Sequence, residues 1–81
     1  MKTKRYIKTE KKIDFVDTHK YQQNQYNNSV VFDMTETEFV HAAFIGFLMD
    51  AHKKYFVQIM PSDAVLNILS LLGLMDYFNL I

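Results

Sequence analysis

The side chains best suited to chemistry in this chain are three scattered histidines and a short acidic run around two threonines. His41 and His52 are eleven positions apart in an apolar segment with a helical pattern, so they share one face of that helix. They would still lie about 16 Å apart at 1.5 Å per residue, too far to bind one metal ion. His19 belongs to another segment. We therefore expect surface or capping roles for these histidines, and no metal site.

The acidic run alternates carboxylates with hydroxyls: Asp33, Thr35, Glu36, Thr37, Glu38. Alternate residues of a loop rarely converge on one point, and no set of nucleophile, base and orienting group accompanies them. We expect these carboxylates to favour the start of the following helix and to remain solvated. Phosphorylation of one of the two threonines is the alternative that stays open.

Composition narrows the class of protein. The 81 residues form one small domain, residues 1–81, without cysteine, so disulfides and thiolate metal sites are excluded. Basic and acidic residues number nine each, and a chain of zero net charge is not expected to bind nucleic acid generally. With no glycine-rich phosphate loop, no signal peptide and no apolar run near the ~20 residues of a membrane span, we expect a cytoplasmic protein without cofactor or enzymatic activity.

The N-terminal segment 1–12 is strongly basic. Six Lys and Arg residues precede Ile13, with only Glu10 against them. This segment could contact anionic lipid or phosphate. We favour a second interpretation, in which residues 5–8 form a solvated edge strand that its lysines protect from pairing.

The hydrophobic pattern predicts alternating strands and helices. Strands separated by helices pair in parallel through right-handed crossovers. The fold class is therefore α/β, with a small mixed, mainly parallel β-sheet of about four strands packed against about three helices. The expected elements are a strand at 5–8, a weak helix at 17–26 capped by Asp17 or Thr18 and ending in a turn at Asn27-Asn28, a buried strand at 30–34, a helix at 39–54, a strand at 56–60, a helix between Ser62 and Gly73, and a strand at 77–80.

The expected helix at 39–54 is apolar on nearly every side. Such a helix is buried on more than one side, and in so small a domain another chain can supply one of those sides. We therefore expect self-association, in the simplest case a homodimer.

The order and spacing of these segments resemble the STAS domain, the family of bacterial anti-sigma factor antagonists. The resemblance covers about residues 11–81. Its carriers are the strand-to-helix entry Ile13-Asp14-Phe15-Val16-Asp17-Thr18, the strand Val30-Val31-Phe32-Asp33-Met34, the apolar pair Phe39-Val40, the stretch Ile45-Gly46-Phe47-Leu48, and Ser62-Asp63-Ala64-Val65 followed by Gly73-Leu74.

The chain departs from the family at its signature. Where STAS domains carry an Asp-Ser-Ser-Gly-like sequence, this chain reads His41-Ala42-Ala43-Phe44. In the family the first serine accepts a phosphoryl group from a partner kinase, and Ala42 has no hydroxyl to do so. Phe44 adds a ring that either anchors a partner at the surface or turns inward to fill the core.

The resemblance implies a non-enzymatic protein–protein interaction module that is not switched by phosphorylation at the usual position. Its partner would be a cytoplasmic anti-sigma factor or a related kinase-like regulator. The alternative is a STAS-like accessory subunit of a lipid-transporting ABC system. The residues expected to contact the partner are Thr35, Glu36, Thr37, Glu38, His41, Ala42 and Phe44.

Overall fold

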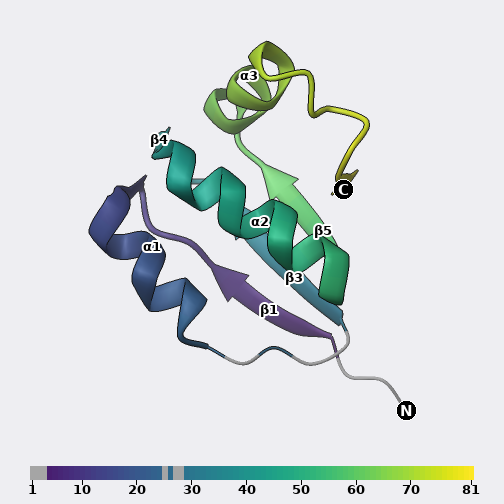
Figure 1. Ribbon diagram of the computed structural model, residues 1–81. Coiled ribbons are helices and arrows are strands. Elements are labelled where there is room, and N and C mark those ends of the chain that lie inside the picture. Colours follow the sequence, from purple (N-terminus) through teal and green to yellow (C-terminus); the bar gives the residue numbers. More distant parts are fainter. Residues whose placement is uncertain (1–3, 25, 27–28) are drawn as a thin grey trace.

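Each helix lies between strands in the chain, which the computed structural model describes at residues 4–24, 26 and 29–81. Within these residues the elements are β1 (Arg5–Lys8), β2 (Lys12–Ile13), α1 (Phe15–Gln22), β3 (Ser29–Met34), β4 (Phe39–Val40), α2 (Ala42–Lys54), β5 (Phe56–Pro61), α3 (Asp63–Leu71) and β6 (Asn79–Leu80) (Figure 1). None of the described helices is long and apolar enough to cross a bilayer.

The main sheet has four strands in the order β1-β3-β5-β6, and every neighbouring pair is parallel. Because each crossover moves in the same direction, its right-handed path places the intervening helix on the same face of the sheet. A second, two-stranded parallel sheet joins β2 to β4. The predicted α/β class and mainly parallel pairing are confirmed.

Aromatic rings fill the space between the helices and the sheet. Phe44 on α2 contacts Tyr21 on α1 at a ring-centroid distance of 5.1 Å and Phe32 on β3 at 6.2 Å. Phe47 joins the cluster at 5.9 Å from Phe32. Phe44 is 0% exposed, so its ring fills the core, and its expected role as a partner-contacting residue at the surface is wrong.

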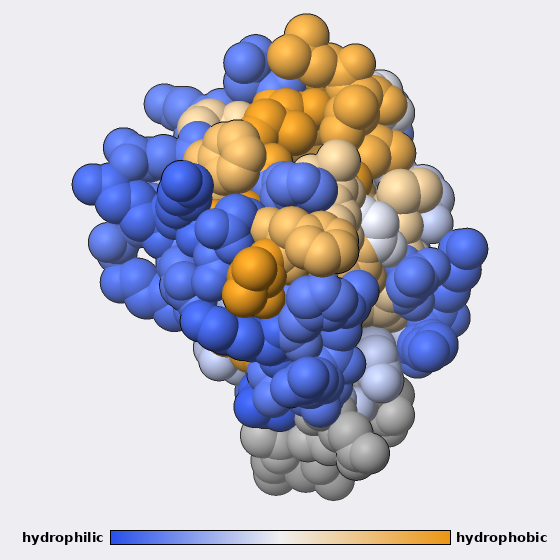
Figure 2. Space-filling model, turned by 60° about the vertical axis from the view of Figure 1, so that its left-hand side comes forward, coloured by the Kyte–Doolittle hydropathy of each residue, from blue (hydrophilic) through white to orange (hydrophobic). Residues whose placement is uncertain are grey.

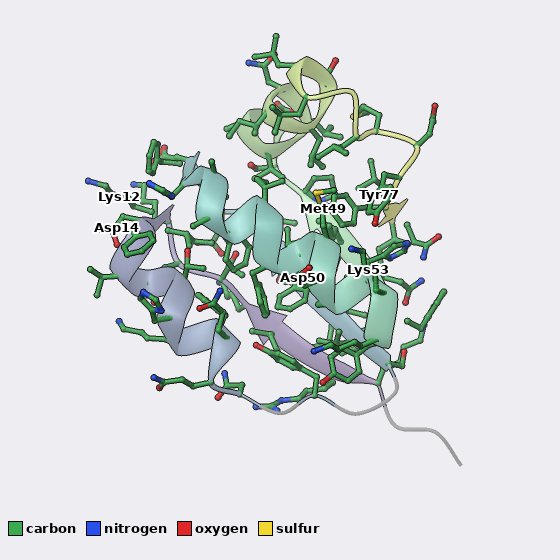
Figure 3. All side chains as sticks on the ribbon, in the orientation of Figure 1. Lys12, Asp14, Met49, Asp50, Lys53 and Tyr77 are labelled. Carbon is green, nitrogen blue, oxygen red and sulfur yellow. The ribbon has the colours of Figure 1, made fainter. Side chains whose placement is uncertain are left out.

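The outer side of α2 is more polar than the sequence pattern indicated. Asp50 and Lys53 are exposed on this helix, as Figure 3 shows, and Gly46 is exposed as well. The helix therefore buries one broad apolar face against the rest of its own domain, and its opposite face does not require cover from another chain.

The start of α1 differs from the prediction. Its N-cap is Asp14, whose Oδ1 accepts from the Asp17 N–H at 3.1 Å, while the Asp14 N–H donates to Asp17 Oδ2 at 3.1 Å. This reciprocal capping box leaves Asp17 and Thr18 inside the helix, so both predicted caps were wrong. The helix ends at Gln22, earlier than predicted, and the turn expected at 27–28 lies outside the described residues.

The predicted helix at 39–54 begins three residues late. Phe39 and Val40 form β4 instead, because pairing with Lys12 and Ile13 satisfies the backbone there. The His41 N–H continues this pairing by donating to Ile13 O at 2.7 Å. The helix proper then starts at 42.

The ends of α3 follow the prediction. Ser62 is its N-cap and accepts from the Val65 N–H at 3.1 Å. Gly73 adopts a left-handed φ of 71°, and the Leu74 N–H reaches back to Leu69 O at 2.8 Å, as in a Schellman motif. The last strand is shorter than predicted, since only Asn79 and Leu80 pair with β5.

Candidate partner-binding surface

The residues predicted to contact a partner surround the carboxyl end of the sheet, but they are not equally accessible. The exposed members are Thr35, Glu36, Glu38 and Ala42, and His41 is half-buried. Thr37 and Phe44 are 0% exposed. A partner that docks on the folded surface cannot reach these last two side chains, so they drop out of the predicted contact set.

Thr37 instead forms buried hydrogen bonds that connect the segments of this surface. Its hydroxyl donates to Glu10 O at 2.7 Å and lies 2.6 Å from the hydroxyl of Thr9. Its carbonyl accepts from the Ser62 hydroxyl at 2.5 Å. These bonds join the end of β1, the loop at 35–38 and the start of α3. The loop is therefore fixed in one shape, and the buried Thr37 hydroxyl is not available to a kinase in the folded chain.

Asp33 organises the exposed beginning of the same loop. Its Oδ1 accepts from the Thr35 hydroxyl at 2.6 Å and from the Thr35 N–H at 3.1 Å. These hydrogen bonds, together with attraction from Lys8, hold the pKa of the Asp33 carboxyl below its ordinary value because they favour the charged form. Thr35 remains exposed, so of the two threonines it alone is accessible for modification.

The basic N-terminal segment and the acidic loop lie against each other. Lys8 forms an ion pair with Glu36, which raises the pKa of the Lys8 amino group. Lys11 Nζ lies 3.5 Å from Glu38 Oε2. All four side chains are well exposed, so each pair contributes little to stability. The pairs do, however, neutralise charge that the sequence alone left open to lipid or phosphate.

The described surface includes an open hollow beside the loop at 35–38 and another beside α2. The first has a volume of about 480 Å³ between the loop and the start of α3, and its lining residues are Lys11, Thr35, Glu36, Thr37, Glu38, Ser62, Asp63 and Ala64. The second, of about 280 Å³, lies beside the carboxyl end of α2 and includes Asp50 and Lys54. The described residues contain no group of three or more His, Asp or Glu side chains placed to hold a metal ion.

The two helix histidines have separate structural roles. His41 caps α2, with its Nδ1 accepting from the Ala43 N–H at 3.0 Å. The His52 ring contacts Tyr77 at 5.1 Å and Phe78 at 5.6 Å, near the end of the chain. Its Nδ1 is buried without a hydrogen-bond partner among the described residues.

The sequence prediction missed three exposed apolar side chains beside the loop. Phe15, Val16 and Phe39 are 54%, 67% and 46% exposed. The Phe15 ring contacts His41 at 5.6 Å, and Lys12 Nζ lies 5.9 Å from the centre of the Phe39 ring. We call Phe15, Phe39 and His41 the aromatic strip. Figure 3 labels Lys12 and Asp14, which precede Phe15 in the chain, near the start of α1.

Hydrophobic side chains are visible on this side of the molecule. Figure 2 shows them in the middle of a largely hydrophilic face and, more extensively, at the top over α3. The capping box of Asp14 and Asp17 is a sequence signal that could have placed Phe15 as the first residue of its helix. The Phe15 ring at that position is 54% exposed.

No match is found when the chain is compared with models of protein families, with curated protein sequences or with solved structures. The likeness to STAS domains therefore rests on the order and spacing of residues within this chain.

Proposed function

We propose that the chain is a non-enzymatic, cytoplasmic protein-interaction module whose partner docks on the aromatic strip and the exposed loop residues beside it. The observation that carries this proposal is the exposure of Phe15 and Phe39 beside a loop that Thr37 ties by hydrogen bonds to Glu10 and Ser62. Exposed aromatic residues gain the most from burial by a partner, and a loop that is already ordered lowers the entropy cost of binding.

The chemistry around the strip suggests what the partner offers. Glu36 and Glu38 carry exposed carboxylates on one side, and their lysine partners are solvent-screened and easily exchanged. A partner whose contact surface has an apolar centre and basic residues around it would therefore complement this surface. By resemblance to STAS domains, an anti-sigma factor or kinase-like regulator is the partner that we propose.

The proposed binding is constitutive. Ala42 occupies the position that corresponds to the family's phospho-acceptor and is exposed in the first turn of α2. A phosphoryl group there would add about two negative charges to the contact surface, whereas alanine adds no charge under any condition. The partner complex should therefore not depend on a kinase or phosphatase at this position.

The test is affinity purification from native cells with identification of the bound proteins, repeated with two variants. Phe39→Ser and Ala42→Asp should each weaken capture of the partner by tenfold or more, because one removes an apolar contact and the other buries a charge. Phe56→Ser is the matched control, since Phe56 is also about half exposed but follows the opposite end of α2. Equal capture by all three variants would place the interface elsewhere.

A second candidate function draws on α3. Leu71 is 79% exposed and Leu72 is 55% exposed, and no charged residue lies between Ala64 and Met75. Such a surface suits permanent attachment in a larger assembly, such as the accessory subunit of a lipid-transporting ABC system. Co-purification with a membrane ATPase, lost in Leu71→Lys and retained in Phe39→Ser, would support this alternative.

A further inference from the structure

The start of α2 is capped by a side chain that can change its charge near neutral pH. The Ala43 N–H donates to His41 Nδ1 at 3.0 Å, and this bond satisfies one of the free amides of the first helical turn. A ring nitrogen accepts a hydrogen bond only while it carries no hydrogen itself. The cap therefore requires the neutral imidazole, with its hydrogen on Nε2.

The caps of the other two described helices do not titrate near neutral pH. α1 begins with the carboxylate of Asp14, and α3 begins with the hydroxyl of Ser62. A serine hydroxyl stays neutral at ordinary pH, and an unperturbed aspartate gains its proton only at about pH 4. An unperturbed imidazole titrates at about pH 6.5. Of these three caps, His41 is therefore the one that changes state close to neutral pH.

A proton on His41 would be unfavourable at this position for a second reason. α2 is 13 residues long and directs the positive end of its dipole at the cap. Its first turn holds no acidic residue, whereas α1 has Asp17 there and α3 has Asp63. A charged imidazole would therefore lose the Ala43 N–H and also face the dipole of its own helix.

The elements around His41 supply no carboxylate that pairs with it. The ring contacts Phe15 of α1 at a centroid distance of 5.6 Å, and the backbone continues the pairing with β2 (Figure 1). The charged and titratable residues on the elements beside His41 are Lys12, Asp14, Asp17, His19, Lys20, Glu36, Glu38 and Asp63. Among the residues that the structure describes, none of these carboxylates forms an ion pair with His41.

We propose that His41 is a pH-sensitive cap of α2, in which the neutral ring holds the first turn of the helix and protonation releases that turn. Ala42 is exposed and Ala43 is half-buried, so little packing resists the opening. Phe44 is 0% exposed and holds the next turn in the core. The opening is therefore confined to the first turn. Since it concerns the start of α2 itself, the inference goes beyond the proposed partner binding and does not depend on it.

Unfolding by urea at a series of pH values tests the direction of the effect. The stabilisation that the cap provides is present above about pH 6.5 and is lost as the pH falls, because only the neutral ring accepts the bond. His41→Ser supplies a capping hydroxyl that does not titrate. Relative to this variant, the folding equilibrium constant of the wild type should fall about three- to fivefold from about pH 8 to about pH 5, the value of one cap.

His19→Ala is the matched control for loss of an imidazole. His19 is exposed and also contacts the Phe15 ring, at 4.9 Å, but its ring caps no helix. The His19→Ala chain should therefore keep the wild-type loss of stability relative to His41→Ser. An identical pH dependence in the wild type and in His41→Ser would overturn the proposal.

Nitrogen-15 NMR of the wild-type chain tests the cap without any substitution. At about pH 8 the His41 ring should carry hydrogen on Nε2 only. Titration to about pH 5 should add a hydrogen on Nδ1 while the hydrogen-exchange protection of the Ala43 amide falls about three- to fivefold. The Val65 amide, which donates to Ser62 Oγ, is the internal control and should keep its protection. Unchanged protection of the Ala43 amide while His41 titrates would contradict the proposal.

Discussion

At the scale of single residues, buried hydroxyls decide the shape of the proposed binding surface more than its exposed charges do. Thr37 and Thr9 are 0% and 4% exposed, and their hydroxyls meet beneath the loop. The lysine–glutamate pairs above them are solvated and contribute little. Loss of one buried hydroxyl group should therefore lower the stability of the domain, whereas loss of one of the exposed ion pairs should have little effect.

Replacement of Thr37 by valine should lower the free energy of unfolding by about 1–3 kcal/mol. The change keeps the size of the side chain but removes the donor to Glu10 O and leaves the Thr9 hydroxyl only its bond to Asp33 O. Thr37→Ser keeps the hydroxyl and should cost less than Thr37→Val. Urea unfolding followed by circular dichroism measures both. Equal losses from the two substitutions would mean that the methyl group, not the hydrogen bonds, matters.

Asp33 should make the free energy of unfolding depend on pH. Its folded-state pKa lies below the unfolded value, so its contribution is present above about pH 4 and is lost as the pH falls through the lowered pKa. The stability difference between wild type and Asp33→Asn should therefore shrink as the pH is lowered below 4. Urea unfolding at a series of pH values measures it. Thr35→Ala removes the main cause of the shift and should flatten the wild-type dependence; a constant difference at all pH values would contradict the prediction.

At the scale of the elements, helix starts are set by side chains that reach back to the backbone. Asp14, His41 and Ser62 each accept a hydrogen bond from the first turn of the following helix. The cap of α1 and the first residue of α2 were mispredicted, because hydrophobic periodicity places the body of a helix better than its start. Ser62 was predicted correctly, since Pro61 and Asp63 mark the same boundary.

The cap at His41 should be replaceable by another acceptor. His41→Ala should destabilise the chain by about 1 kcal/mol, because the Ala43 N–H then loses its acceptor. His41→Ser restores a better capping side chain and should recover most of that loss. Thermal unfolding compares them, with the exposed His19→Ala as the matched control for loss of an imidazole. If His41→Ala and His19→Ala behave alike, the cap has no measurable role.

At the scale of the whole molecule, one aromatic cluster joins both helices to the sheet. Phe44 is in contact with rings from α1, α2 and β3, and it is fully buried. A domain of this size has a total stability of only about 4–12 kcal/mol. The free-energy cost of burying a charge at this position would exceed the total stability of the domain.

Substitution of Phe44 by aspartate should therefore unfold the chain and not merely weaken partner binding. Circular dichroism and one-dimensional NMR should show loss of helix signal and of dispersed resonances. Phe44→Leu, which keeps an apolar side chain, should remain folded with stability reduced by about 1–2 kcal/mol. A folded Phe44→Asp variant would show that this ring is less central than its contacts indicate.

The sequence by itself determined the α/β class, the parallel pairing, the buried strand at 30–34 and both ends of α3. These depend on local signals: β-branched apolar runs, a serine cap after proline, and a glycine that takes a positive φ. The absence of a hydroxyl at Ala42 can also be read from the sequence, because it requires only residue identity. Such features need no knowledge of what lies across the fold.

Only the tertiary structure decided which of the candidate residues a partner could touch. Thr37 and Phe44 belong to the same stretch as Thr35 and Ala42, yet contacts with β1, α1 and β3 bury the first two and leave the others exposed. Phe15 and Phe39, which the predicted contact set did not include, are about half exposed beside those residues. Burial depends on contacts between residues distant in sequence, and local patterns do not encode those contacts.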